Sequence, residues 1–186
     1  DNTGMNIRMK QMKVLFLNAG NENGGGMHHI LRVLCTLQKL YTDQFCLGVF
    51  EKKELYEQAN KLGIPTYYFA NSTKFNPQIL RQLQAFIHRE QITHVHTHGP
   101  RANVYMSFVK PFVKIPWIIT LHSNPYCDFS NSFKGRLYTY LHTNALKKAH
   151  HIITVCDAFR PILHRLAIPE EKITTIRNGI AFQPEN

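Results

Sequence analysis

The chain has 186 residues, of which 44% are apolar and 18% are charged, and its formal net charge is +10. This composition excludes a disordered chain and is sufficient for one well-buried core. The positive charge indicates an anionic partner, either a phosphorylated small molecule, an acidic membrane surface or nucleic acid. Because the basic residues are scattered and form no nucleic-acid-binding motif, nucleic acid is not expected among the partners.

Seven short apolar runs predict strands, and helical patterns separate them. The predicted strands cover residues 13–19, 44–50, 64–70, 92–98, 116–122, 150–156 and 172–177. The predicted helices cover residues 27–41, 52–63, 76–91, 101–112 and 133–149, with a short helix over 158–167. This alternation predicts an α/β fold, namely a Rossmann-like, doubly wound, mainly parallel sheet of about seven strands with helices on both faces.

The domain is expected to span residues 13–180, with no internal repeat or linker. Residues 1–12 are polar and are expected to be a tail or a remnant of cloning, and residues 181–186 are expected to begin a linker. The four cysteines lie far apart without a C-x-x-C pair, which argues against a zinc site and favours a reducing, cytoplasmic location. No run approaches the roughly 18 apolar residues of a spanning helix, and no signal peptide is evident.

Three glycines, Gly24, Gly25 and Gly26, follow the first predicted strand. At a strand-to-helix turn, glycines let backbone N–H groups approach an anion, and the helix N-terminus adds its positive dipole end. The dinucleotide fingerprint and the phosphate-loop motif are both absent, although Glu51 follows the second strand, where a ribose-binding acid would stand. The glycines therefore either approach a phosphate or form a tight turn that allows close packing.

Histidines gather at the ends of the fourth and fifth predicted strands. His94, His96 and His98 alternate and so share one face of a strand. Because no matching acidic residue stands at this edge, a metal site is not expected; the histidines are either packed in the strand or bind a polar substrate through His96 or His98. His122 ends the next strand and is placed to meet a ligand hydroxyl or phosphate. No G-x-S-x-G elbow or carboxylate pair is present, so the domain would hold only part of an enzyme's machinery.

The order of five segments resembles the N-terminal domain of family-4 glycosyltransferases, retaining enzymes of the two-domain GT-B fold. The segments are "GGGMHHIL", "ITHVHTHG", "WIITLHSN", "HHIITVCDAF" and "IPEEKITTIRNGI". The resemblance runs from about Lys13 to Ile180. It implies an acceptor-side domain whose missing second domain binds the nucleotide-sugar donor, without a metal or other cofactor. The acceptor would be a glycan or a lipid-linked molecule, and the isolated half would be inactive.

The resemblance also implies roles for individual residues. The glycine loop, Gly24–Gly26, would face the donor phosphates and the acceptor, and His122 would be the catalytic histidine at the reacting sugar. The acceptor cleft would be bordered by His96, His98, Ser123 and Asn124. The chain would leave the domain at a hinge formed by Asn178 and Gly179. The sequence departs from the family pattern at three positions, Met27, Cys156 and Ala181.

Two other functions remain open at this point. The chain is also compatible with half of a GT-B-fold sugar-nucleotide epimerase, or with a non-enzymatic nucleotide-binding domain on a Rossmann-like sheet. The basic surface could also contact anionic lipid, which would place the protein peripherally at the inner face of a membrane. The donor sugar, the acceptor, the linkage and the oligomeric state do not follow from the sequence.

Overall fold

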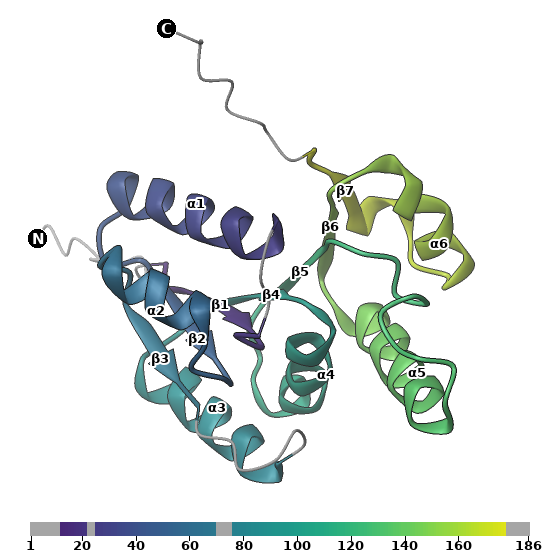
Figure 1. Ribbon diagram of the computed structural model, residues 1–186, viewed down its shortest axis with the longest axis horizontal. Coiled ribbons are helices and arrows are strands. Elements are labelled where there is room, and N and C mark those ends of the chain that lie inside the picture. Colours follow the sequence, from purple (N-terminus) through teal and green to yellow (C-terminus); the bar gives the residue numbers. More distant parts are fainter. Residues whose placement is uncertain (1–11, 22–24, 70–75, 178–186) are drawn as a thin grey trace, which may run out of the picture.

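A computed structural model describes residues 12–21, 25–69 and 76–177 of the chain (Figure 1). Its seven strands form one sheet in the order β3-β2-β1-β4-β5-β6-β7, and every neighbouring pair is parallel. The strands are β1 (Val14–Asn18), β2 (Phe45–Val49), β3 (Thr66–Tyr68), β4 (His94–His98), β5 (Trp117–Leu121), β6 (His151–Thr154) and β7 (Ile173–Thr175). The predicted Rossmann-like α/β fold with its seven-stranded parallel sheet is therefore confirmed.

Helices cover both faces of the sheet, as predicted. They are α1 (Gly25–Leu40), α2 (Glu54–Lys61), α3 (Pro77–Arg89), α4 (Pro100–Val109), α5 (Phe133–Lys148) and α6 (Arg160–Arg165). Short 3-10 turns are η1 (Lys110–Phe112), η2 (Asp157–Phe159) and η3 (Glu170–Lys172). As expected, Asn76 caps α3, because its side chain accepts a hydrogen bond from the backbone N–H of Gln78, and Pro77 takes the first helical position.

The predicted elements agree with those of the structure to within three residues at each end, and the differences at three of them have a local cause. The third strand, predicted over 64–70, is paired only over Thr66–Tyr68 at the edge of the sheet. The helix predicted over 101–112 ends as a 3-10 turn from Lys110, since Pro111 has no N–H to continue the α-helical pattern. The short helix predicted over 158–167 divides into η2 and α6.

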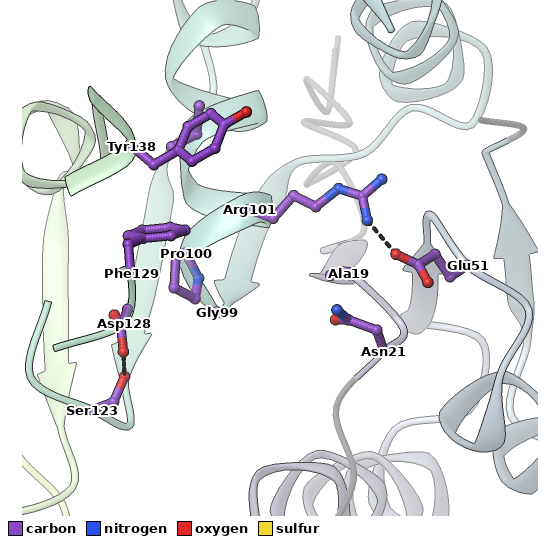
Figure 2. Close-up of a pocket in the computed structure, with 11 residues that line it drawn as sticks. Ala19, Asn21, Glu51, Gly99, Pro100, Arg101, Ser123, Asp128, Phe129 and Tyr138 are labelled. Atoms are coloured by element: carbon purple, nitrogen blue, oxygen red, sulfur yellow. Dashed lines mark hydrogen bonds and ion pairs between the residues drawn. The ribbon is translucent and has the colours of Figure 1, made fainter. Parts of the chain in front are cut away.

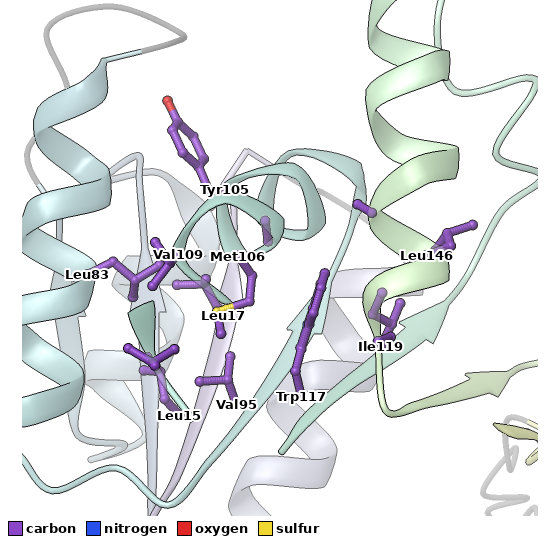
Figure 3. Close-up of a cluster of buried hydrophobic side chains, with 14 of the residues drawn as sticks. Leu15, Leu17, Leu83, Val95, Tyr105, Met106, Val109, Trp117, Ile119 and Leu146 are labelled. Atoms are coloured by element: carbon purple, nitrogen blue, oxygen red, sulfur yellow. The ribbon is translucent and has the colours of Figure 1, made fainter. Parts of the chain in front are cut away.

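Alternation along the strands divides the buried side chains into two clusters. On one face, Leu15, Leu17 and Val95 pack beneath α3, α4 and α5; Figure 3 shows Trp117 and the α4 residue Met106 in this cluster. On the other face a second cluster packs beneath α1 and α2, with members Phe16, Leu47, Val49, Met27, Ile30, Leu34 and Leu55. The helices of the two faces are thus held by side chains that point in opposite directions from the same strands.

The strand order reverses between β1 and β4, which places the ends of two chain segments side by side. Asn18 at the end of β1 is level with His98 at the end of β4. Asn18 is fully buried; its Nδ2 donates to the carbonyl of His98 at 3.0 Å, and its Oδ1 accepts from the N–H of Gly20 at 2.7 Å. Ligands of open parallel sheets bind in the crevice at such a reversal. The architecture therefore directs the search for a site to this edge.

Gly20, just beyond β1, cannot readily carry a side chain. Its φ is +88°, and an added Cβ would lie 2.4 Å from the carbonyl oxygen of Glu51. Gly25, by contrast, has no atom within 4 Å of an added Cβ. Of these two positions, the conformational requirement for glycine thus falls on Gly20 and not on Gly25.

We predict that Gly20→Ala lowers the free energy of unfolding by about 2 kcal/mol or more, because the alanine would combine backbone strain with a clash against backbone. Gly25→Ala, the matched control, should change it by less than about 0.5 kcal/mol. Urea unfolding of the two variants measures both values. Equal stability of the two variants would contradict this account of the turn after β1.

Candidate functional site

Two adjoining cavities open at the carboxyl edge of the sheet, around the strand reversal. The larger has a volume of about 460 Å³ and is lined by residues that follow β1, β2, β4 and β5, together with α4 and α5 (Figure 2). The smaller has a volume of about 220 Å³ and lies between the start of α1 and the ends of β4 and β5. Both cavities share the lining residues Gly99, Pro100, Ser123 and Asp128. They form the candidate site.

Four histidines cluster at the smaller cavity, on the sheet face covered by α1. Nδ1 of His98 lies 3.1 Å from Nε2 of His122, and Nε2 of His96 lies 2.7 Å from the Thr120 hydroxyl. The ring of His29, from α1, lies 5.1 Å from that of His122. The alternation of His96 and His98 along β4, noted in the sequence, brings both rings to this one face.

Burial keeps these imidazoles uncharged at neutral pH. It lowers the pKa of His96 to about 3 and that of His122 to about 4, and it holds the pKa of His98 well below its usual range. The neighbouring histidines lower these values further. The pKa of His29 is lowered by burial and by Arg32. The cluster therefore offers hydrogen-bond donors and acceptors to a ligand, not a positive charge.

The hydrogen bond between His98 and His122 assigns their tautomers. Nε2 of His98 is buried and has no hydrogen-bond partner. An unpaired buried acceptor costs less than an unpaired buried N–H, so we place the proton of His98 on Nδ1, where it is donated to His122. His122 then accepts through Nε2 and carries its own proton on Nδ1. Because His122 lines the smaller cavity, it can offer this N–H to a ligand.

The structure separates the predicted site residues into three groups. His122, Ser123 and Gly26 line the smaller cavity, and Ser123 also lines the larger one. His96 and His98 line neither of these two cavities and lie behind His122. The third group lies outside the described residues and comprises Gly24, Asn178 and Gly179.

Two further predicted residues have positions that limit what they can do. Asn124 lines neither cavity; its Oδ1 accepts from the backbone N–H of Tyr126 at 3.0 Å, which shapes the loop after β5. Gly25 is the first residue of α1, a helix with no acidic side chain in its first turn. The backbone N–H groups of a helix's first turn have no partner within the helix and are suited to a negatively charged group.

Several lining residues were not indicated by the sequence. Figure 2 shows Phe129 and Tyr138 on one side of the larger cavity and the ion pair of Arg101 with Glu51 on the other. Glu51 also pairs with Lys53 at 2.9 Å, so both of its carboxylate oxygens are engaged. Glu51 therefore pairs with both Arg101 and Lys53, and it holds Arg101 at the side of the larger cavity.

Within the described ranges, no group of three or more His, Cys, Asp or Glu side chains is arranged to hold a metal ion. None of the helices in those ranges combines the length and the apolar character needed to cross a bilayer.

Comparison with solved structures shows the same fold in several proteins. Anabaena Alr3699/HepE in complex with UDP and glucose has a TM-score of 0.72 at 18% identity, over 91% of this chain and 45% of that one. The lipopolysaccharide outer core galactosyltransferase WaaB in its apo form has a TM-score of 0.67 at 14% identity, over 93% and 47%. The UDP-N-acetylglucosamine 2-epimerase from Rickettsia bellii has a TM-score of 0.63 at 13% identity, over 89% and 44%. The chain thus spans less than half the length of these structures.

A search among curated proteins found no match. The sheet order and the helices on both faces are those of a Rossmann-like half of a GT-B fold. Residues 23–183 match the family model for Glycosyltransferase Family 4, which covers most of the chain. On this evidence the chain belongs to Glycosyltransferase Family 4.

Proposed function

We propose that the chain is the N-terminal, acceptor-side domain of a retaining glycosyltransferase, formed by residues 13–180 with a linker beginning at residue 181. The enzyme would transfer a sugar from a nucleotide-sugar donor to a glycan or a lipid-linked acceptor. Family membership supports this proposal, and so does the coverage of less than half of each similar structure. UDP and glucose are bound to the similar Alr3699/HepE, which supports a nucleotide-sugar donor.

The observation that carries the proposal is the position of His122, which lines the smaller cavity with its Nε2 3.1 Å from Nδ1 of His98. In the proposed reaction, the N–H of His122 binds a sugar hydroxyl at the reacting centre. The start of α1, with Gly25 and Gly26, faces the departing diphosphate and stabilises its growing negative charge. A donor-binding domain would supply the rest of the site, so the isolated chain should not turn over donor.

We expect His122→Ala to lower kcat about 100-fold or more in the protein that joins this chain to its donor-binding domain, since a positioned hydrogen-bond donor would be lost. Release of labelled sugar from a panel of UDP-sugars in the presence of glycan acceptors measures the effect. His88→Ala is the matched control, because His88 is exposed near the end of α3. Equal turnover by the two variants would contradict a catalytic role for His122.

The protonation state of His122 can be followed in the isolated chain. Because burial lowers its pKa to about 4, the imidazole should stay neutral from pH 8 to pH 6 and take up a proton only as the pH falls toward 4. Its ring NMR signals should therefore be constant between pH 8 and pH 6, whereas free histidine in the same buffer titrates with a pKa of about 6.5. A midpoint near 6.5 for His122 would show that the ring is solvated, and the proposed geometry would be wrong.

An epimerase is the second candidate, because the UDP-N-acetylglucosamine 2-epimerase from Rickettsia bellii shares the fold. The two enzyme classes differ in their need for an acceptor. A transferase forms a glycosylated product only when an acceptor is present, whereas an epimerase converts a UDP-sugar to its epimer without one. Incubation of the same protein with UDP-sugars, with and without acceptor, separates the two. A nucleotide-binding domain without enzymatic activity would give neither product.

Peripheral contact with an anionic membrane is also part of the proposal. The first half of α5 exposes Phe133, Leu137 and Tyr140, and the cations Lys134 and Arg136 are exposed beside them. Exposed aromatic and basic side chains on one helix are suited to the interface of an anionic bilayer. This surface would bring the cavities near a lipid-linked acceptor.

We predict that the chain sediments with vesicles containing phosphatidylglycerol and much less with neutral phosphatidylcholine vesicles. Replacement of Phe133 and Tyr140 by serine should reduce this binding several-fold, because their rings would no longer enter the interface. Serine replacement of exposed Tyr41, at the end of α1, is the control. Equal binding to both kinds of vesicle would contradict the proposed recognition of an anionic membrane.

A further inference from the structure

A line of buried polar side chains runs on the face of β4 opposite the histidine cluster. It begins at Trp117 in β5 and passes through Thr97 in β4, Asn103 in α4 and His142 in α5. It ends at Asp128, in the loop between β5 and α5, which also accepts a hydrogen bond from Ser123. The side chain of Asp128 is only 10% exposed and that of His142 only 1%. Polar groups so deeply buried must satisfy one another.

The hydrogen bonds of this line have a single direction. The indole N–H of Trp117 can only donate, and it lies 2.9 Å from Oγ1 of Thr97. The Thr97 hydroxyl donates in turn to Oδ1 of Asn103 at 2.5 Å. Asn103 therefore presents its Nδ2 to Nε2 of His142, at 3.0 Å. Nε2 of His142 must accept this bond, so His142 carries its proton on Nδ1.

The opposite direction of these hydrogen bonds would leave a buried hydroxyl proton without an acceptor. If Nε2 of His142 carried the proton, Asn103 would have to turn its amide oxygen toward His142. Thr97 would then receive N–H groups from both Trp117 and Asn103, and its own hydroxyl proton would lose the buried acceptor that it now has. Loss of a buried hydrogen-bond partner is unfavourable, so the first direction is the consistent one.

The line ends on a carboxylate at the boundary of the two cavities. Nδ1 of His142 lies 3.6 Å from Oδ2 of Asp128, beyond hydrogen-bond distance, and neither atom has a hydrogen-bond partner among the described residues. The Ser123 hydroxyl donates to Oδ1 of Asp128 at 2.5 Å. Burial holds the pKa of Asp128 above its usual range, and the hydrogen bond from Ser123 offsets part of this rise, while burial lowers the pKa of His142 to about 4. Ser123 thus donates to one oxygen of this carboxylate, and the Nδ1–H assigned to His142 lies nearest the other oxygen.

We propose that Asp128 is a positioning residue that makes Ser123 a hydrogen-bond acceptor toward both cavities, so that this end of the cleft selects a neutral, hydroxyl-bearing ring over an anionic one. The Ser123 hydroxyl has a single proton, and it donates that proton in the hydrogen bond to Asp128. The Ser123 oxygen that lines the cavities therefore has only lone pairs to offer, and a bound group must supply the donor.

Charge and shape around Ser123 favour the same ligand class. The carboxylate of Asp128 lines both cavities and repels anions at this end, whereas the cation Arg101 lies on the opposite side of the larger cavity, in its ion pair with Glu51 (Figure 2). Phe129 and Tyr138, beside it in the larger cavity, can cover the apolar face of a sugar ring (Figure 2). The inference deepens the proposed function, on which it rests for the identity of the ligand as an acceptor sugar. The hydrogen-bond direction itself does not depend on that function.

The direction is tested in the isolated chain by ¹⁵N NMR of the histidine side chains. His142 should show a protonated Nδ1 and an unprotonated Nε2. In Asn103→Asp the amide donor becomes an acceptor, so Nε2 of His142 should become protonated. A wild-type His142 protonated at Nε2 would overturn the proposal, and this measurement requires no variant to fold.

Selectivity is tested with methyl glucoside and glucuronate, which share a pyranose ring and differ in charge. The wild-type chain should bind methyl glucoside at least tenfold more tightly than glucuronate. Changes in the backbone amide NMR signals of residues 122–129 during titration measure both affinities. In Asp128→Asn, Nδ1–H of His142 should attract the new amide oxygen, so the amide N–H₂ would face Ser123. The Ser123 oxygen would then accept from this amide, and its hydroxyl would be free to donate toward the cavity. The preference for methyl glucoside should then fall at least tenfold.

Ser123→Ala serves as the second variant should Asp128→Asn fail to fold. It should weaken methyl glucoside binding several-fold without strengthening glucuronate binding. Equal affinity of the wild-type chain for the two sugars, binding of neither, or an unchanged preference in both variants would overturn the proposal. Because these assays require no turnover, their failure is distinct from a failure of the longer protein to transfer sugar.

Discussion

The side chain of Asn18 joins the two strands at which the sheet reverses its order. It ties the end of β1 to the carbonyl of His98 and to the backbone of Gly20. This one buried amide therefore sets the position of β4, whose last residues support the site, and the course of the chain as it leaves β1. Gly20 then turns away with a positive φ, close against the carbonyl of Glu51. The cavities exist because the two chain segments separate here after running side by side.

Strand β4 supplies polar groups to both faces of the sheet at this edge. His96 and His98 point toward α1, and Thr97 points toward α4 and Asn103. The two faces carry separate hydrogen-bond systems that meet at the loop after β5, where His122 belongs to one and Ser123 to the other. Two adjacent residues of one loop thus take opposite hydrogen-bonding roles, a donor at His122 and an acceptor at Ser123. A sugar hydroxyl, which both donates and accepts, suits such a pair.

The fold could be predicted because each strand and helix is marked by a pattern in its own short stretch of sequence. Apolar runs of strand length alternate with helical patterns, and caps such as Asn76 mark the helix boundaries. His122 and Ser123 could also be placed, because residues after parallel strands must meet at one edge. The order of the strands does not follow from periodicity, and it became known only from the structure.

The rest of the site depends on contacts between residues far apart in the chain. Asp128 appears in the sequence only as one polar residue in a polar loop, and His142 as a histidine in the middle of a helix. Their importance arises from burial and from partners 14 to 39 positions away, which no local pattern records. For His98 the sequence left open whether the ring packs in the strand or contacts a ligand, and the structure buries the ring behind His122. The sequence indicates which residues lie at the carboxyl edge of the sheet, but it does not indicate how deeply each of them is buried.

The central claim is that this edge of the sheet binds the hydroxyl groups of an acceptor sugar. A crystal structure of the chain soaked with a neutral disaccharide tests it most directly. The account predicts a sugar ring in the two cavities, with hydroxyl groups within hydrogen-bond distance of Ser123 Oγ and His122 Nδ1. A disaccharide bound on another face of the domain, with these two atoms left without a sugar contact, would contradict it.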